Sequence, residues 1–195
     1  MKKQFFMLFF ILIISTLTYA QWSNNPTLNN AICDLSGEQA IPKVVTSFTG
    51  DTYIGWFSND SGNYDVRLQR LDSQGNELWE HNGILVSDNP AMTWLTDWDM
   101  TVDADNHAIL TFQDIRNAGN NNIYAYRIAP DGTSVWGNDG LELSNSSIFD
   151  ASPKVCVTST NNAVITWQAE NVIIMQKISP DGTLLWGDNG ITMSC

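Results

Sequence analysis

The chain has few basic residues, few histidines and few cysteines, and each scarcity excludes a class of function. Only 9 of its 195 residues are Lys or Arg, against 21 Asp and Glu, so the formal net charge is −12. Proteins that bind nucleic acids neutralise phosphates with clusters of Lys and Arg, and we therefore expect no nucleic-acid partner. Two histidines and no Cys-x-x-Cys pair provide no ligand set at zinc spacing. We accordingly predict no metal and no cofactor.

Cysteine occurs only at Cys33, Cys156 and Cys195. An odd number permits at most one internal disulfide, and the sequence leaves open which two residues, if any, form it. Cys156 lies in the alternating run 154–158, where we expect it to pack as a small buried hydrophobic residue.

Long hydrophobic runs are absent except at the N-terminus. Lys2 and Lys3 precede the apolar run 5–14, which is followed by small and polar residues. This order predicts a secretory signal peptide over residues 1–20, because the run is shorter than the ~20 apolar residues that an uncleaved anchor needs. The remaining chain, 21–195, carries 7 basic and 21 acidic side chains, a formal charge of −14. We expect a secreted protein, extracellular or at the cell surface with the periplasm as the alternative, and no membrane insertion after cleavage.

Helical patterns are scarce as well. The composition is 43% hydrophobic, 11% aromatic and only 15% charged, which is too apolar for disorder and too poor in charged helix formers for a coiled coil. The apolar runs are short, often alternate with polar residues, and end at Asn, Asp, Gly or Pro, as β-strands do. Runs of this kind include 53–57, 108–112 and 163–167. We predict an all-β fold.

An internal repeat is the strongest signal in the sequence. Segments 73–87, 130–144 and 180–194 share the frame G-x-x-x-W-x-x-x-G-x-x-x-S without a gap, and their tryptophans are 57 and 50 residues apart. We interpret the glycines and tryptophans of this frame as structural residues rather than ligand platforms. They are Gly75, Trp79 and Gly83, then Gly132, Trp136 and Gly140, then Gly182, Trp186 and Gly190.

Each repeat unit reads as three strands, a glycine turn, a tryptophan and a short fourth strand. The units cover about 40–88, 94–145 and 150–195, within one repeat domain at 21–195. A single small sheet cannot bury an indole of ~150–250 Å², so we expect each unit to pack against its neighbour. Four strands in about fifty residues are typical of a propeller blade. We predict an incomplete β-propeller-like array of about three four-stranded antiparallel blades.

The ends of the array carry further information. Cys33 takes the position of the serine that ends each frame, so residues 27–33 predict a lone N-terminal strand that completes the last blade. Closed propellers have four to eight blades, and only three units are present. We therefore expect a chain truncated at its C-terminus, with further blades in missing sequence, or one that self-associates; an open stack of three blades is the alternative.

The repeats resemble the propeller-like repeats of secreted and surface proteins from gliding, Bacteroidetes-type bacteria. Unit two matches most fully, through the Phe-Gln-Asp-x-Arg run at 112–116, the run 123–128, and the glycine–tryptophan frame that follows. Unit three lacks the Asp-x-Arg, and unit one has 59–63 in its place. The resemblance covers about 40–194 and implies blades and export, but no particular activity.

Residues for chemistry are hard to find in this sequence. No Gly-x-Ser-x-Gly elbow is present, and neither histidine has a nucleophile at a recognisable spacing. Asp103, Asp105 and Asn106 offer oxygen ligands but lack the full calcium-loop pattern, so we interpret them as a turn. Arg116 is expected to pair with Asp114 across a hairpin as a structural residue. We assign no catalytic or ligand-binding residue.

The sequence therefore predicts a secreted or cell-surface, non-enzymatic binding or scaffold module built from propeller repeats. An extracellular carbohydrate or protein is the expected partner, because repeat proteins bind on their extended or loop-lined surfaces. The alternative is a fragment of an extracellular propeller enzyme such as a glycoside hydrolase, whose catalytic carboxylates, ~5–9.5 Å apart in such enzymes, would lie on missing blades.

Overall fold

The computed structural model describes residues 30–91, 97–117, 119–145 and 147–193. The signal peptide predicted at 1–20 and the terminal Cys195 lie outside these residues. Within the described ranges the chain forms strands, turns and loops, and no helix is long and apolar enough to cross a membrane.

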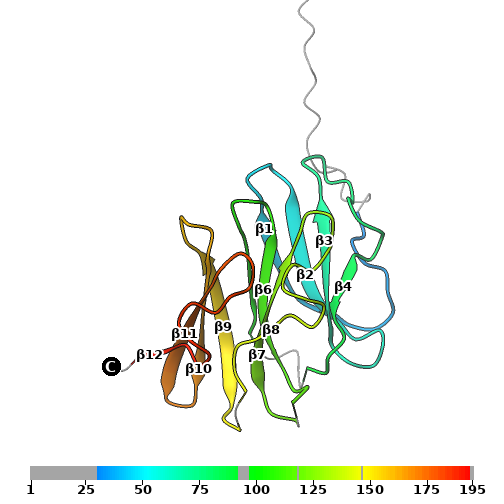
Figure 1. Ribbon diagram of the computed structural model, residues 1–195. Helices are drawn as coiled ribbons and strands as arrows, with labels where there is room; N and C mark the ends of the chain where they lie inside the picture. Colours follow the sequence, from blue (N-terminus) through cyan, green and yellow to red (C-terminus); the bar gives the residue numbers. More distant parts are fainter. Residues whose placement is uncertain (1–29, 92–96, 118, 146, 194–195) are drawn as a thin grey trace, which may run out of the picture.

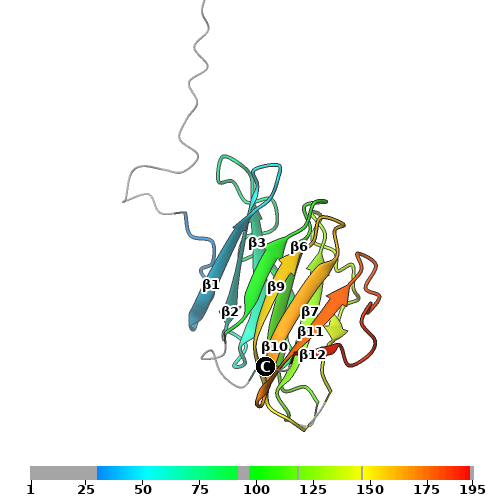
Figure 2. The ribbon, with the colours of Figure 1, turned by 90° about the vertical axis from the view of Figure 1, so that its left-hand side faces the viewer.

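Three four-stranded antiparallel sheets follow one another along the chain, and each keeps its strands in sequence order. The sheets stand side by side like the blades of an open propeller (Figures 1 and 2). The all-β fold and the three blades predicted from the repeat are thereby confirmed. The first blade comprises β1 (Gln39–Thr46), β2 (Thr52–Ser58), β3 (Asp65–Leu71) and β4 (Ile84–Ser87). The second comprises β5 (Asp99–Val102), β6 (Ala108–Asp114), β7 (Asn122–Ile128) and β8 (Leu141–Glu142). The third comprises β9 (Asp150–Val157), β10 (Ala163–Ala169), β11 (Val172–Ile178) and β12 (Ile191–Met193).

The core lies between the blades rather than within any one of them. Successive residues of β6 belong to different clusters: Leu110 packs toward the first blade and Ile109 toward the third. This follows from the two-residue period of a strand, which sends neighbouring side chains to opposite faces. Every residue of β6 and β7 is buried as a result. The middle blade is therefore covered on both faces, whereas each outer blade is covered by a neighbouring blade on only one.

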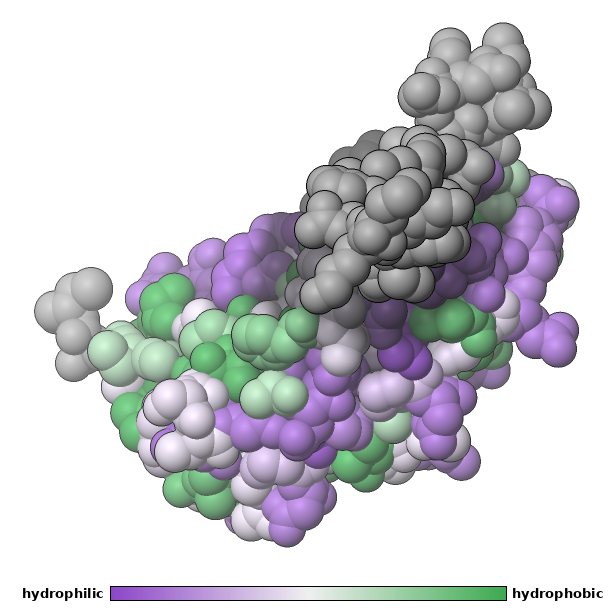
Figure 3. All heavy atoms as spheres, turned by 90° about the horizontal axis from the view of Figure 1, so that it is seen from above, coloured by the Kyte–Doolittle hydropathy of each residue, from purple (hydrophilic) through white to green (hydrophobic). Residues whose placement is uncertain are grey.

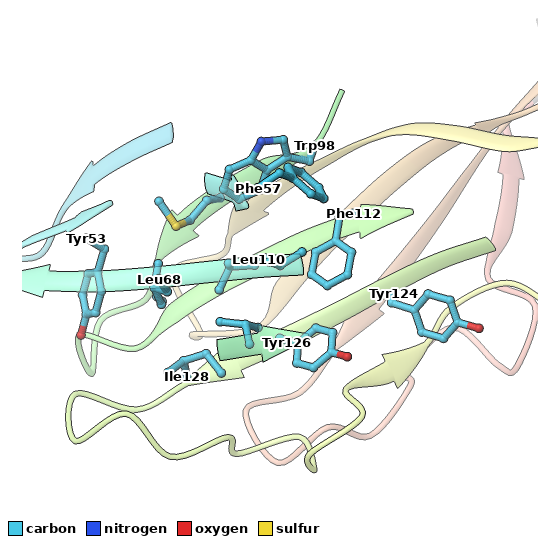
Figure 4. Packing of buried hydrophobic residues seen from close by; sticks show 13 residues of the cluster. Tyr53, Phe57, Leu68, Trp98, Leu110, Phe112, Tyr124, Tyr126 and Ile128 are labelled. Carbon is cyan, nitrogen blue, oxygen red and sulfur yellow. The ribbon is translucent and has the colours of Figure 1, made fainter. Parts of the chain in front are cut away.

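Aromatic rings fill most of the junction between the first two blades. Phe57 meets Trp98 edge-on at 5.7 Å between ring centroids, and Phe112 stacks on Tyr126 at 5.3 Å (Figure 4). A hydrogen bond of 2.9 Å from the indole of Trp98 to the carbonyl of Ile41 ties the loop before β5 to β1. Buried rings of this size and geometry contribute strongly to packing.

The repeated tryptophans join each blade to the turn of the next. Arg70 and Trp79 both donate to the carbonyl oxygen of Pro130, at 2.7 and 3.2 Å. Arg127 and Trp136 donate in the same way to Pro180, at 2.7 and 3.1 Å. We call this arrangement of two donors and one main-chain carbonyl the turn junction.

The second glycine of each repeat permits the chain to pass close to the sheet. Gly140 has φ = +67°, and a Cβ atom there would lie 2.7 Å from the carbonyl oxygen of Ala125. Gly83 and Gly190 have the same φ and equally close carbonyls. Only glycine adopts this backbone conformation at low cost and leaves room for the neighbouring strand.

Two expectations differ from the structure. The lone strand expected at 27–33 is a loop in its described part, 30–33, because the array is open and the last blade, which this strand would complete, does not lie beside it (Figure 1). Cys156 is exposed rather than buried. It lies on the side of β9 that faces away from the second blade, and no described element covers that side.

Candidate functional site

Three groups of charged side chains lie near the blade ends and are the candidates for chemistry. We call them the inner-edge cluster, the Arg116 cluster and the Asp103 cluster. The inner-edge cluster contains Lys43, Asp97, Asp99 and Lys154. The Arg116 cluster contains Asp114, Arg116, Tyr124, Tyr126 and Glu142. The Asp103 cluster contains Asp103, Asp105, His107 and Arg127.

The inner-edge cluster links all three blades. Lys43 of β1 contacts Asp97 at 3.3 Å, and Lys154 of β9 contacts the other oxygen of the same carboxylate. Partial burial of Asp97 opposes its ionisation, but the two ammonium groups outweigh burial and lower the pKa of Asp97. Asp99 of β5 accepts a 3.0 Å hydrogen bond from the main chain of Val155. The cluster thus offers two partly exposed ammonium groups around one ionised carboxylate.

The Arg116 cluster is a network at the end of the second blade in which Asp114, Tyr124 and Tyr126 are buried and Glu142 is exposed. The guanidinium of Arg116 lies 3.7 Å from the ring centroid of Tyr124, and its Nε contacts both oxygens of Asp114, at 3.0 and 2.9 Å. Tyr124 donates to Glu142 at 3.1 Å. Burial raises the pKa of the Asp114 carboxyl although Arg116 acts in the opposite sense, and burial also raises the pKa of Tyr124. In Figure 4 the hydroxyl of Tyr124 points away from the core cluster.

This network has little access to a substrate. Asp114 is 1% exposed, and its oxygens are engaged by the side chain of Arg116. A general acid needs both a raised pKa and hydrogen-bond reach to the group it protonates. Asp114 meets the first condition and not the second, so the cluster is suited to fixing the β6–β7 hairpin.

The Asp103 cluster sits in the turn between β5 and β6. Ligand atoms of Asp103, Asp105 and His107 lie within 4.8 Å of one another, close enough to share a cation. Asp103, however, is fully buried and accepts from the Nε of Arg127 at 2.7 Å. Its other oxygen accepts the main-chain N–H groups of Asp105 and His107, both at 2.9 Å. These hydrogen bonds stabilise the turn. The guanidinium of Arg127 already occupies the position beside the Asp103 carboxylate that a bound cation would need.

The residues singled out from the repeat lie at the blade junctions. Gly132 lies against the indole of Trp79, and Gly182 lies against that of Trp136. Trp136 is 5% exposed, whereas Trp79 and Trp186 are half-buried. The glycines of the three turns, Gly75, Gly132 and Gly182, all have positive φ.

The inner-edge cluster was missed by sequence reasoning. Its signal is present as the Pro-Lys pair at 42–43, which recurs at 153–154 in the matching position of the third unit. The carboxylate that joins the two lysines comes from the intervening unit, where the pattern is absent. No local spacing therefore brings the three charges together.

No protein-family model and no curated protein matches the chain. Among solved structures, the chain is similar to an endo-arabinase from Bacteroides thetaiotaomicron, with 14% identity and a TM-score of 0.44 over 79% of this chain. It spans 61% of that protein. A C-terminal domain of YpeB from Bacillus megaterium gives 12% identity and a TM-score of 0.21, over 75% of this chain and 87% of that one.

Proposed function

We propose that the chain is a secreted or cell-surface module of β-propeller blades that binds a partner and catalyses no reaction. One observation carries the proposal. Burial raises the pKa of the Asp114 carboxyl, but this carboxyl is only 1% exposed. Glycoside hydrolases need a protonated carboxyl beside an open site. The accessible Asp97 is instead held ionised between two lysines.

The inner edge of the blades is the surface that fits a partner. Lys43 and Lys154 are partly exposed there, with 28% and 47% of their side chains accessible. Phe149, one residue before β9, is 59% exposed. Exposed charged donors and exposed aromatic rings are groups that protein and carbohydrate partners contact. The resemblance to repeats of secreted proteins supports the extracellular location of this surface.

Binding is tested with a glycan array and a hydrolysis screen on the full chain. For any ligand that the array identifies, we expect the binding affinity to fall by about tenfold or more when Lys43 and Lys154 are both changed to Ala. The matched control is Phe48→Ala, because Phe48 is 79% exposed in a turn away from this cluster. Far-ultraviolet circular dichroism shows that each variant keeps its strands. Ligand binding that is indifferent to the lysine changes would contradict the proposal.

The alternative is that the chain is part of an extracellular glycoside hydrolase. It is favoured by one feature: two carboxylates, that of Asp97 in the loop before β5 and that of Asp99 at the start of β5, belong to the inner-edge cluster. In that case the hydrolysis screen shows turnover, and Asp97→Asn or Asp99→Asn abolishes it. Such a result would replace the binding proposal.

A further inference from the structure

The two ends of the array expose surfaces that are buried at the internal junctions. Ile173 of β11 is 44% exposed, whereas the matching residues of the other blades, Val66 and Ile123, are 2% and 0% exposed. We call this surface of the third blade the front face. In the view from above, hydrophobic residues gather toward the left (Figure 3), the side on which the third blade lies in Figure 1.

The front face also carries an unused pair of donors. Lys177 and Trp186 occupy the positions of Arg127 and Trp136 in the turn junction. Neither the ammonium of Lys177 nor the indole nitrogen of Trp186 has an acceptor within the part of the chain that the structure describes. Lys177 also has no carboxylate partner there, unlike Arg127, which pairs with Asp103. Within the described residues, the third blade thus presents the two donors of a turn junction without a carbonyl acceptor.

The first blade carries the other half. Ile54 is partly exposed and lines an apolar pocket of about 260 Å³ with Trp56, while its counterparts Leu110 and Ile165 are fully buried by a preceding blade. We call this surface the back face. Ser73 stands two residues before the turn glycine, where Pro130 and Pro180 supply the junction carbonyls.

We propose that two copies of the chain associate head to tail, with the front face of the third blade of each copy against the back face of the first blade of the other. Lys177 and Trp186 of one copy then donate to the carbonyl of Ser73 in the second. The contact is heterologous, and such contacts form rings when the rotation closes. Two copies of three blades make a ring of six, within the range of closed propellers.

For the ring to close, one of two segments that would occupy the same position must move. Residues 30–32 and the turn at 75–77 line one groove, as 84–86 and 132–134 do at the first internal junction. The N-terminal segment therefore occupies the place of a fourth strand on the back face. In the pair of chains, β12 of the other copy would occupy this same fourth-strand position. β12 is short, because it consists of three residues, and all three are exposed. In the closed pair, residues 30–33 take the edge of β11 and β12 moves away.

The first measurement is the mass of residues 21–195 in solution, by light scattering and sedimentation from about 1 to 100 µM. We expect a two-chain species that dissociates on dilution. A chain ended at Gly190, which lacks β12, is expected to associate at least about tenfold more tightly, because it leaves the edge of β11 open. A single-chain mass throughout this range for the intact chain would overturn the proposal.

Charged substitutions then test which faces meet. We expect Ile173→Asp and Ile54→Asp each to remove the two-chain species, because each places a carboxylate in one of the two faces. A mixture of the two variants retains one intact contact and forms a weaker pair. An Ile54→Asp variant that remains dimeric would show that front faces meet each other and would overturn the head-to-tail arrangement. Phe48→Asp, a change at an exposed residue outside both faces, is the matched control.

Discussion

At the scale of single residues, the repeat places the same side chain in two different environments. Trp136 is 5% exposed beneath the turn of the third blade, whereas Trp186 is half-buried on the front face. We expect Trp136→Ala to lower the free energy of unfolding by ~3–5 kcal/mol, because it leaves a cavity between two blades. Trp186→Ala is expected to cost much less in the monomer.

Urea unfolding of both variants, at a concentration where the chain is monomeric, measures this difference. The two substitutions are chemically identical and lie at the same repeat position, so each is the control of the other. Equal losses would mean that the indoles are held within their own blades and not by the turn junction.

A single histidine connects the N-terminal segment to the first blade. His81 lies 3.0 Å from Glu77 and 3.4 Å from Asp34. Hydrogen bonding to Glu77, assisted by the charges of both carboxylates, raises the pKa of His81 above its usual 6.5. A group whose pKa is raised on folding stabilises the folded state fully at low pH, and this contribution is lost as the pH rises through the folded pKa.

We therefore expect the stability difference between the native chain and His81→Gln to be larger at pH 6 than at pH 8. Urea unfolding at the two pH values measures it, and an NMR titration of the His81 ring gives the pKa directly. A ring that titrates at or below 6.5 would contradict the hydrogen-bond geometry. Comparison with the variant removes the contribution of all other titrating groups.

At the scale of structural elements, the glycine between each tryptophan and its fourth strand sets the path of the chain. Gly140 and Gly137 both have positive φ, which costs an alanine roughly 1–2 kcal/mol. A Cβ atom at Gly140 would also collide with the carbonyl of Ala125, whereas one at Gly137 meets no atom within 4 Å. Gly140→Ala should thus lower the melting temperature clearly more than Gly137→Ala. Similar melting temperatures for both would show that the strand moves to accommodate the methyl group.

The sequence was sufficient for those elements that depend on local pattern. Gly132 and Trp136 define a turn and a buried ring by spacing alone, and their repetition implies neighbouring sheets that cover them. The Asp114–Arg116 pair could be predicted because the two residues are two positions apart on one hairpin, and the structure places them in contact. Local chemistry and local geometry coincide in each of these cases.

Features that depend on long-range contacts could not be predicted. Cys156 was expected in the core because it lies in the run 154–158 between two valines, but its burial depends on contacts with another blade on that side. The inner-edge cluster requires Asp97 of one unit to meet lysines of two others. Ile41 and Ser152 have φ of 48° and 52°, and each lies beside an irregular pairing in its strand. The sequence carries no signal for that conformation beyond the proline that follows each of them.

At the scale of the whole molecule, most basic side chains are paired with carboxylates, whereas most acidic side chains lie outside such pairs. Six of the seven basic side chains of residues 21–195 lie within 4 Å of a carboxylate, and Lys177 has no such partner among the residues that the structure describes. The paired side chains are Lys43, Arg67, Arg70, Arg116, Arg127 and Lys154. Each pair neutralises one cation, so the charge of −14 is carried mainly by acidic residues outside these six pairs.

This imbalance gives the association of two copies a definite salt dependence. Two chains of the same sign repel at low ionic strength, and salt screens the repulsion beyond a Debye length of ~10 Å at 0.1 M. We expect the two-chain species to become tighter between 0.05 and 0.5 M sodium chloride, values chosen to span about a threefold change in that length. Sedimentation at the two concentrations measures the change. Weaker association in high salt would indicate an interface held by ion pairs instead.

The turn junction has an acceptor that every residue type supplies. Its oxygen belongs to the main chain of Pro130 or Pro180, so replacement of turn side chains leaves the acceptor in place. The two donors of each junction belong to the preceding blade. A unit duplicated within the gene thus carries both a pair of donors and an acceptor carbonyl. Arrays of this type can therefore lengthen or shorten during evolution without compensating substitutions elsewhere.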